Sequence, residues 1–157
     1  MQEFSYSDKG IALTKSFEGL RLEAYQDCAG IWTIGYGHVG LSEGVTIDAA
    51  EAEALLCADL ADAVACVNRA VTATISQHQF DAMVDFCFNA GRGNFMQSTL
   101  RRKVNLEDFD GAAAQFGLWV HAGGKVVAGL VRRRKAEAEM FGNAKAIDYE
   151  YVLLGSQ

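Results

Sequence analysis

Hydrophobic residues near the start of the chain recur at the spacing of one helix face. Ser7 is a residue type that caps helix N-termini, and the apolar residues after it are Ile11, Leu13, Phe17 and Leu20. Gly19 favours the left-handed turn that closes helices, so the first helix is predicted to end directly after Glu18.

The pattern changes between residues 22 and 46, where short apolar runs such as IWTIGYG and VTI alternate with glycines. The separating glycines are Gly30, Gly35, Gly37, Gly40 and Gly44. Short apolar runs with glycine turns predict a small antiparallel sheet. Such a sheet is too small to be stable alone and must pack against helices.

After Thr46 the apolar spacing is helical. A helix rich in alanine and leucine is predicted up to about residue 69. SQHQ at 76–79 has the S-x-x-Q spacing of a capping box, before a helix that closes at Gly91. Further helices are predicted near 98–105, 107–117 and 129–141.

These elements predict an α+β fold in one domain over residues 1–157. Its predicted parts are an N-terminal lobe with the sheet, a connecting helix, a larger helical lobe and a C-terminal extension, at about 7–46, 47–70, 71–142 and 143–157. YVLL in the extension is predicted to form a short strand or helix, or part of a poorly ordered tail. Two lobes joined by one helix leave a cleft, which is the expected place for a ligand.

The composition is that of a globular protein, with 50% hydrophobic and 22% charged residues. The N-terminus has neither the basic start nor the apolar core of a signal peptide, and no apolar run has the length of a membrane span. We therefore expect accumulation in the cytoplasm and no stable membrane insertion.

The formal net charge of −6 is unevenly distributed, with an acidic run at 43–62 and a basic segment at 101–135. A solvated helix face is the simpler interpretation of the acidic run, and the basic segment is either such a face or a contact for an anionic polymer. The basic segment lacks interleaved aromatic residues and any DNA-binding motif, so no nucleic-acid partner is expected.

The cysteines and histidines do not form a metal-binding pattern. There is no CxxC, and the three histidines do not cluster with the four cysteines, which are Cys28, Cys57, Cys66 and Cys87. Reduced and mostly buried thiols are expected; a disulfide is an alternative in an oxidising space, without an assignable pair. His38 is predicted to be a neutral core residue or part of a salt bridge.

Three residues of the N-terminal lobe carry candidate chemistry. Glu18 is expected at a helix end, Asp27 in a hairpin turn and Thr33 in the returning strand. Each alone also reads as an ordinary surface, turn or strand residue. Together they supply an acid, a second carboxylate and a water-holding hydroxyl, which glycoside hydrolysis requires.

The spacing of these residues, E-x8-D-x5-T within EGLRL and TIGYGH, resembles the phage-type lysozyme (endolysin) family, glycoside hydrolase family 24. The likeness covers residues 7–142 and continues in VTIDAAEAEALL, QFDAMVDFCFNAGRGNF, STLRRKVN and WVHAGGKVVAGLVRRRKAEAEMF. It implies a lysozyme-like fold and hydrolysis, with inversion, of the β-1,4 bond between N-acetylmuramic acid and N-acetylglucosamine.

The resemblance also implies roles for single residues. Glu18 would protonate the glycosidic oxygen, while Asp27 and Thr33 would position and activate a water, or Asp27 would stabilise the oxocarbenium-like state. Saccharide contacts in similar proteins map onto Val39, Phe88, Ser98 and Gln115. For these four residues a purely structural role is slightly favoured over a saccharide contact, except at Ser98. Phe88 fits a place in the core equally well.

The implied substrate is bacterial peptidoglycan, with no cofactor, and the implied protein is a monomer. It would reside in the host cytoplasm before lysis and act on the wall after a holin gives access. Two alternatives stay open: a lytic transglycosylase, which would need neither Asp27 nor Thr33, and a non-catalytic module that binds peptidoglycan or protein.

Overall fold

The computed structural model describes residues 2–142, and the predictions for 143–157 lie outside the described residues. The chain separates into two compact units. One is Thr14–Ala61, and the other contains the residues up to Leu13 and those from Asp62 onward. Helices α1 (Asp8–Glu18) and α2 (Ala49–Ala70) each contribute residues to both units.

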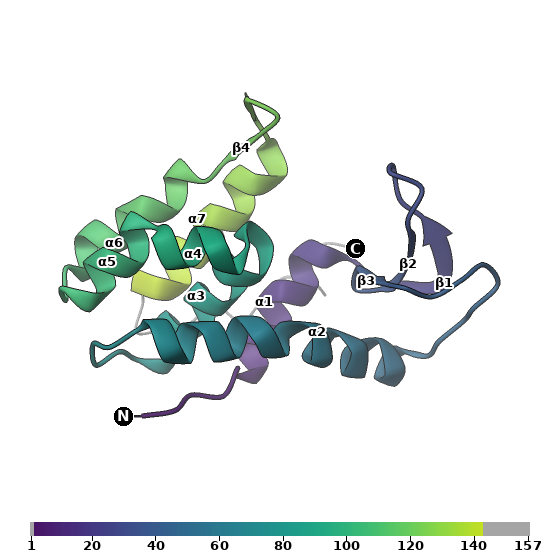
Figure 1. Cartoon of the computed structure of the whole chain (residues 1–157), viewed down its shortest axis with the longest axis horizontal. Coiled ribbons are helices and arrows are strands. Elements are labelled where there is room, and N and C mark those ends of the chain that lie inside the picture. The colour runs from purple at the N-terminus through teal and green to yellow at the C-terminus, as the bar shows by residue number, and fades with distance from the viewer. Residues whose placement is uncertain (1, 143–157) are drawn as a thin grey trace. The chain divides into compact units, whose positions relative to one another are not determined.

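The unit Thr14–Ala61 contains the predicted antiparallel sheet, with strand order β1-β2-β3 (Figure 1). The strands are β1 (Arg21–Gln26), β2 (Trp32–Gly35) and β3 (His38–Val39). The isolated bridge Glu23–Thr46 adds a further contact at β1. This arrangement confirms the sheet that the glycine-separated runs predicted.

The second unit is mainly helical. After α2 come α3 (Gln77–Ala90), α4 (Arg92–Gln97), α5 (Thr99–Asn105), α6 (Phe109–Gln115), the 3-10 helix η1 (Phe116–Leu118) and α7 (Ala128–Gly142). Every residue from Phe80 to Cys87 is buried, so α3 is the central helix of this unit. The rings of Phe95, Phe116 and Trp119 pack edge-on against Phe86 with centroids 5.4–6.4 Å apart. The predicted α+β fold, with a small sheet in one unit and a larger helical unit, is confirmed by this structure.

The helix boundaries follow the predicted capping residues. The Ser7 hydroxyl accepts the Gly10 N–H at 3.2 Å, and α1 ends at Glu18 with Gly19 at φ +69°. Both bonds of the predicted capping box join Ser76 and Gln79. These local signals were sufficient because a cap needs only residues three or four positions apart.

Three short elements were not predicted from the sequence. Helix α4 has only six residues, too few for a clear apolar period. Strands β4 (His121–Ala122) and β5 (Lys125–Val126) form a two-residue hairpin with Gly123 and Gly124 at positive φ. Glycine pairs of this type favour a hairpin turn, which is the signal that could have found it.

The basic run of α7 is partly internal, which corrects the expectation of a solvated face or polymer contact for these residues. Arg133 is 5% exposed and makes two 2.9 Å bonds to the carboxylate of Asp85 on α3. Arg134 is 1% exposed, and its Nε lies 2.9 Å from Oε2 of the buried Glu137. Burial of a charge requires such partners, and Asp85 is 48 residues away in sequence.

The buried Glu137 gives the stability a predicted pH dependence. Burial raises the pKa of Glu137 well above its usual 4.5, with a further contribution from Asp85 and opposition from Arg134 and Arg133. The folded state therefore binds this proton more tightly than the unfolded chain. The stabilisation is fully present below pH 4.5 and is lost as pH rises through the folded-state pKa.

Glu137→Gln should remove the part of the pH dependence of stability that comes from Glu137. In urea unfolding at a series of pH values, the free energy of unfolding of the wild type minus that of the variant should fall as pH rises above 4.5. The slope should reach up to about 1.4 kcal/mol per pH unit, the value for one proton. A difference that is constant or grows with pH would contradict the raised pKa.

No helix among residues 2–142 is long and apolar enough to cross a membrane. The four cysteines are free thiols. Cys66 and Cys87 are buried, whereas Cys28 and Cys57 are exposed, so the expectation of mostly buried thiols is only half right.

Candidate active site

Glu18 is the last residue of α1 and is half-buried. The positive φ of Gly19 turns the chain directly after it into β1. The carboxylate lies beside the turn between β2 and β3, where a Cβ added to Gly37 would be 3.5 Å from Glu18 Oε2. Glycine at 37 therefore keeps an open space next to one carboxylate oxygen.

Asp27 organises the turn between β1 and β2. Its Oδ1 accepts the backbone N–H groups of Ala29 at 2.8 Å and Ile31 at 2.9 Å. Its own backbone is bonded as well, since its N–H donates to the Ile31 carbonyl and its carbonyl accepts from Gly30. Among the described residues, Oδ2 accepts no hydrogen bond, so one carboxylate oxygen is fixed and the other is available.

Thr33 lies on β2 with only 5% of its surface exposed. Its hydroxyl donates to the Ile31 carbonyl at 3.0 Å. Because that bond uses the hydroxyl proton, the oxygen lone pairs of Thr33 remain available as acceptors. Asp27 and Thr33 are thus both anchored to Ile31, the carboxylate through its N–H and the hydroxyl through its carbonyl.

This arrangement can orient a water molecule. A water has two protons to donate, and Asp27 Oδ2 and the Thr33 hydroxyl oxygen are two acceptors anchored to the same residue. The third residue, Glu18, belongs to the same compact unit and can supply a proton.

The four predicted saccharide contacts lie in different surroundings. Val39 on β3 is 55% exposed and pairs directly with Thr33, so the two side chains share one face of the sheet. Phe88 and Gln115, both half-buried, belong to the helical unit. Their binding role stays a prediction.

Ser98 has a structural role in this fold. It is 3% exposed and caps α5, where its hydroxyl accepts the Arg101 N–H at 3.1 Å and donates to the Phe95 carbonyl at 2.7 Å. A saccharide would have to share this hydroxyl with the cap. Its proposed substrate contact also stays a prediction.

His38 lies against Asp59 on α2, with Nδ1 2.9 Å from Asp59 Oδ2, which matches the salt-bridge alternative of the two predicted for it. This bridge attaches β3 to α2 and supports the turn that carries Gly37. Among residues 2–142, no three histidine, cysteine or acidic side chains gather in a way that could hold a metal ion.

Gly37 is the site residue that the sequence reading did not single out. Gly37→Ala would place a Cβ at φ +88°, which costs about 1–2 kcal/mol, and would set a methyl group beside the Glu18 carboxylate. We expect a loss of activity on the order of tenfold beyond that from reduced stability, because small displacements of catalytic groups are costly. Gly44→Ala is the matched control, since Gly44 has φ +80° and nothing within 4 Å of an added Cβ.

The measurement is the melting temperature and initial rate of both variants. Similar melting temperatures with a lower rate only for Gly37→Ala support the placement of Glu18. Equal rates would show that the space beside Oε2 has no role.

The comparisons with known proteins identify the family of this chain. The sequence model of the phage lysozyme family matches residues 15–137. An endolysin of Acyrthosiphon pisum secondary endosymbiont phage 1 is 43% identical over 143 residues, covering 88% of this chain and 98% of the relative.

Solved structures show the same likeness. The muramidase domain of SpmX from Asticaccaulis excentricus has a TM-score of 0.82 at 42% identity, covering 88% of this chain and 98% of its own. An endolysin from Escherichia coli O157:H7 phage FAHEc1 has a TM-score of 0.87 at 35% identity, covering 93% and 98%. The chain belongs to the phage lysozyme family and is an enzyme of the lysozyme class.

Proposed function

We propose that this protein hydrolyses the β-1,4 bond between N-acetylmuramic acid and N-acetylglucosamine in bacterial peptidoglycan, with inversion at the anomeric carbon. The proposal rests on one observation. Asp27 and Thr33 both hydrogen bond to the backbone of Ile31, in the compact unit that also contains Glu18. The names of the similar proteins, endolysin and muramidase domain, support the same reaction class.

Glu18 is the proposed general acid. It lies at the carboxyl end of α1, is partly buried, and has its Oε2 beside the space that Gly37 keeps open. The proton moves to the glycosidic oxygen as the bond to the anomeric carbon breaks, so the leaving sugar departs as a neutral alcohol. The open space beside Gly37 admits the oxygen that receives this proton.

Asp27 and Thr33 are the proposed water site. The water donates one proton to Asp27 Oδ2 and one to the Thr33 hydroxyl oxygen, and its lone pair attacks the anomeric carbon opposite the leaving group. Asp27 takes the first proton as the new bond forms. Inverting enzymes keep their two carboxyl groups roughly 6.5–9.5 Å apart to leave room for this water, which is the separation expected between Glu18 and Asp27.

The sugar face is proposed to lie along Val39, whose exposed side chain adjoins Thr33 on the sheet. Phe88, Ser98 and Gln115 of the helical unit are proposed as further contacts with the glycan. Aliphatic and aromatic groups suit the apolar faces of sugars, and the amide and hydroxyl suit their hydroxyl groups.

Stereochemistry tests the inversion directly. Proton magnetic resonance during cleavage of a peptidoglycan glycan should show the α anomer of the new reducing end before mutarotation equilibrates it. Initial release of the β anomer would show that the anomeric configuration is retained. It would contradict the proposal that a water held by Asp27 and Thr33 attacks the anomeric carbon directly.

Thr33 should contribute less than the two carboxylates. Thr33→Val keeps the β-branched shape on β2 and removes the hydroxyl, so one of two contacts to the water is lost. A loss of about 10-fold in kcat is expected for one hydrogen bond of this type. Thr33→Ser keeps the hydroxyl and should retain most of the rate, and a larger loss for Thr33→Ser than for Thr33→Val would reverse this assignment.

The biological setting is proposed to be phage-induced lysis of a bacterial host by a monomeric enzyme. The protein would reside in the host cytoplasm and reach the wall through a holin. Expression in a bacterial host with and without a co-expressed holin tests this route. Lysis that depends on the holin supports it, and equally fast lysis without the holin contradicts it.

A further inference from the structure

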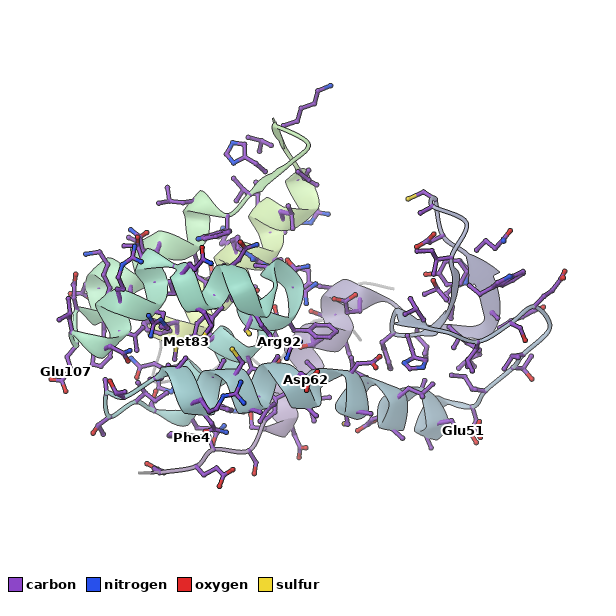
Figure 2. The ribbon with its side chains drawn as sticks, in the orientation of Figure 1. Phe4, Glu51, Asp62, Met83, Arg92 and Glu107 are labelled. Atoms are coloured by element: carbon purple, nitrogen blue, oxygen red, sulfur yellow. The ribbon has the colours of Figure 1, made fainter. Side chains whose placement is uncertain are left out.

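The two faces of the small sheet carry side chains of different kinds. Ile34 on β2 is fully buried, and its direct cross-strand partner His38 on β3 lies against Asp59 of α2. The side chains of Ile34 and His38 therefore share the face that is turned to the first half of α2, where Figure 2 labels Glu51. Successive residues of a strand point to opposite faces, so Thr33 belongs to the other face.

Thr33 has an apolar neighbour on each side of it across the sheet. Tyr25 on β1 and Val39 on β3 are both direct cross-strand partners of Thr33. Direct partners have Cβ atoms about 5 Å apart on one face, so the three side chains form a row. Tyr25 is half-buried and Val39 is 55% exposed. The hydroxyl that is proposed to hold the attacking water thus lies between an aromatic ring and an aliphatic side chain.

Ile31 extends this apolar surround toward Asp27. It lies two positions before Thr33, so strand alternation places it on the same face. The Asp27 N–H donates to the Ile31 carbonyl at 2.9 Å, which continues the pairing of the two strands up to the turn. Ile31 is 49% exposed. The proposed water site is therefore bordered by Tyr25, Ile31 and Val39, whose apolar surface is partly free for a ligand.

Arg21 holds the ring of Tyr25 in place. Its Cζ atom lies 4.4 Å from the centroid of the Tyr25 ring, at the other end of the same strand. A guanidinium at this distance is attracted to the negative face of the ring. The ring is thereby oriented before any ligand arrives, which lowers the entropy cost of binding.

We propose that Tyr25 is a substrate-binding residue that packs against the sugar ring attacked by the water, and that Arg21 is its positioning residue. This inference rests on the proposed function, because it concerns the substrate of the same site. The ligand class is a β-linked pyranose with equatorial substituents, whose two faces present C–H groups. Aromatic rings offer such groups a large apolar area and a negative π face. A sugar packed on Tyr25 would bring its anomeric carbon next to Thr33.

The test measures glycan affinity separately from turnover. The full chain with Glu18→Gln, which should bind without cleaving, is titrated calorimetrically with a peptidoglycan tetrasaccharide that lacks stem peptides. Tyr25→Leu, Tyr25→Phe and Arg21→Gln are each added to this background. Trp32→Leu is the matched control, because Trp32 is an aromatic residue next to Thr33 on β2 that points to the opposite face. The melting temperature of every variant is recorded.

Tyr25→Leu should weaken binding of the tetrasaccharide by about fivefold to tenfold, the value of one aromatic contact. Tyr25→Phe keeps the ring and should retain most of the affinity. Arg21→Gln keeps the ring but not its cation, so a loss of about twofold to threefold is expected. Trp32→Leu should leave the affinity of the folded protein unchanged. With Glu18 restored, Tyr25→Leu should raise KM by a larger factor than it lowers kcat.

Unchanged affinity with Tyr25→Leu would overturn the proposal, and so would an absence of binding by Glu18→Gln itself. Equal losses for Tyr25→Leu and Tyr25→Phe would overturn the role of the ring. Equal losses for Tyr25→Leu and Trp32→Leu would show a general disturbance of the sheet instead of a contact with the sugar. The proposed function fails by a different result, namely that the unmodified protein releases no new reducing ends from peptidoglycan.

Discussion

Glu18→Gln should abolish turnover while the protein stays folded. Glutamine keeps the size and position of the side chain at the end of α1 but has no proton to give to the glycosidic oxygen. Loss of a general acid costs about 10²–10⁴-fold, and the rate should fall by at least that amount. Initial rates on purified peptidoglycan and the melting temperature are the measurements.

Glu23→Gln is the matched control, because Glu23 is an exposed glutamate on β1 in the same unit. It makes the same chemical change a few residues away and should keep the wild-type rate. Wall clearing by Glu18→Gln equal to that of the wild type would favour a non-catalytic binding module. A large fall in melting temperature for Glu18→Gln would contradict a purely chemical role.

Asp27→Asn should be nearly as severe. The amide oxygen can still accept from the N–H groups of Ala29 and Ile31, so the turn is retained. The side chain can no longer take a proton from water at the position of Oδ2, because an amide nitrogen is a donor. A fall in kcat of about 10²–10⁴-fold is expected, as for loss of a general base.

Asp27→Ala separates the two roles of this carboxylate. It removes the acceptor for two backbone N–H groups as well as the base, so it should lower the melting temperature by more than Asp27→Asn does. If Asp27→Asn lost as much stability as Asp27→Ala, its lost activity would reflect a distorted turn. If Asp27→Asn stayed active, a lytic transglycosylase reaction with Glu18 alone would be favoured.

The sequence was sufficient for the parts of the site that depend on near neighbours. Gly19 ends α1 at Glu18, and the glycine-separated runs form the hairpin that carries Asp27 and Thr33. The three residues of the candidate site therefore all lie within about sixteen consecutive positions of the sequence. The structure added Ile31, an apolar residue with no chemical signal, as the common anchor of Asp27 and Thr33.

Features that depend on distant partners could not be predicted. The basic run on α7 read as surface because its partner Asp85 lies 48 residues earlier, so Arg133 and Arg134 carried no sign of burial. The cap that Ser98 forms on α5 is by contrast local, since Arg101 lies three residues later, and the sugar contact that the resemblance implied for Ser98 stays a prediction.

The most direct test of the central claim is a peptidoglycan digest in isotopically labelled water, with muropeptides identified by mass spectrometry. Hydrolysis by a water held at Asp27 and Thr33 predicts reducing N-acetylmuramic acid ends that carry one labelled oxygen, and none of these products with Glu18→Gln. Anhydro-muropeptides without label as the main products of the wild type would contradict it.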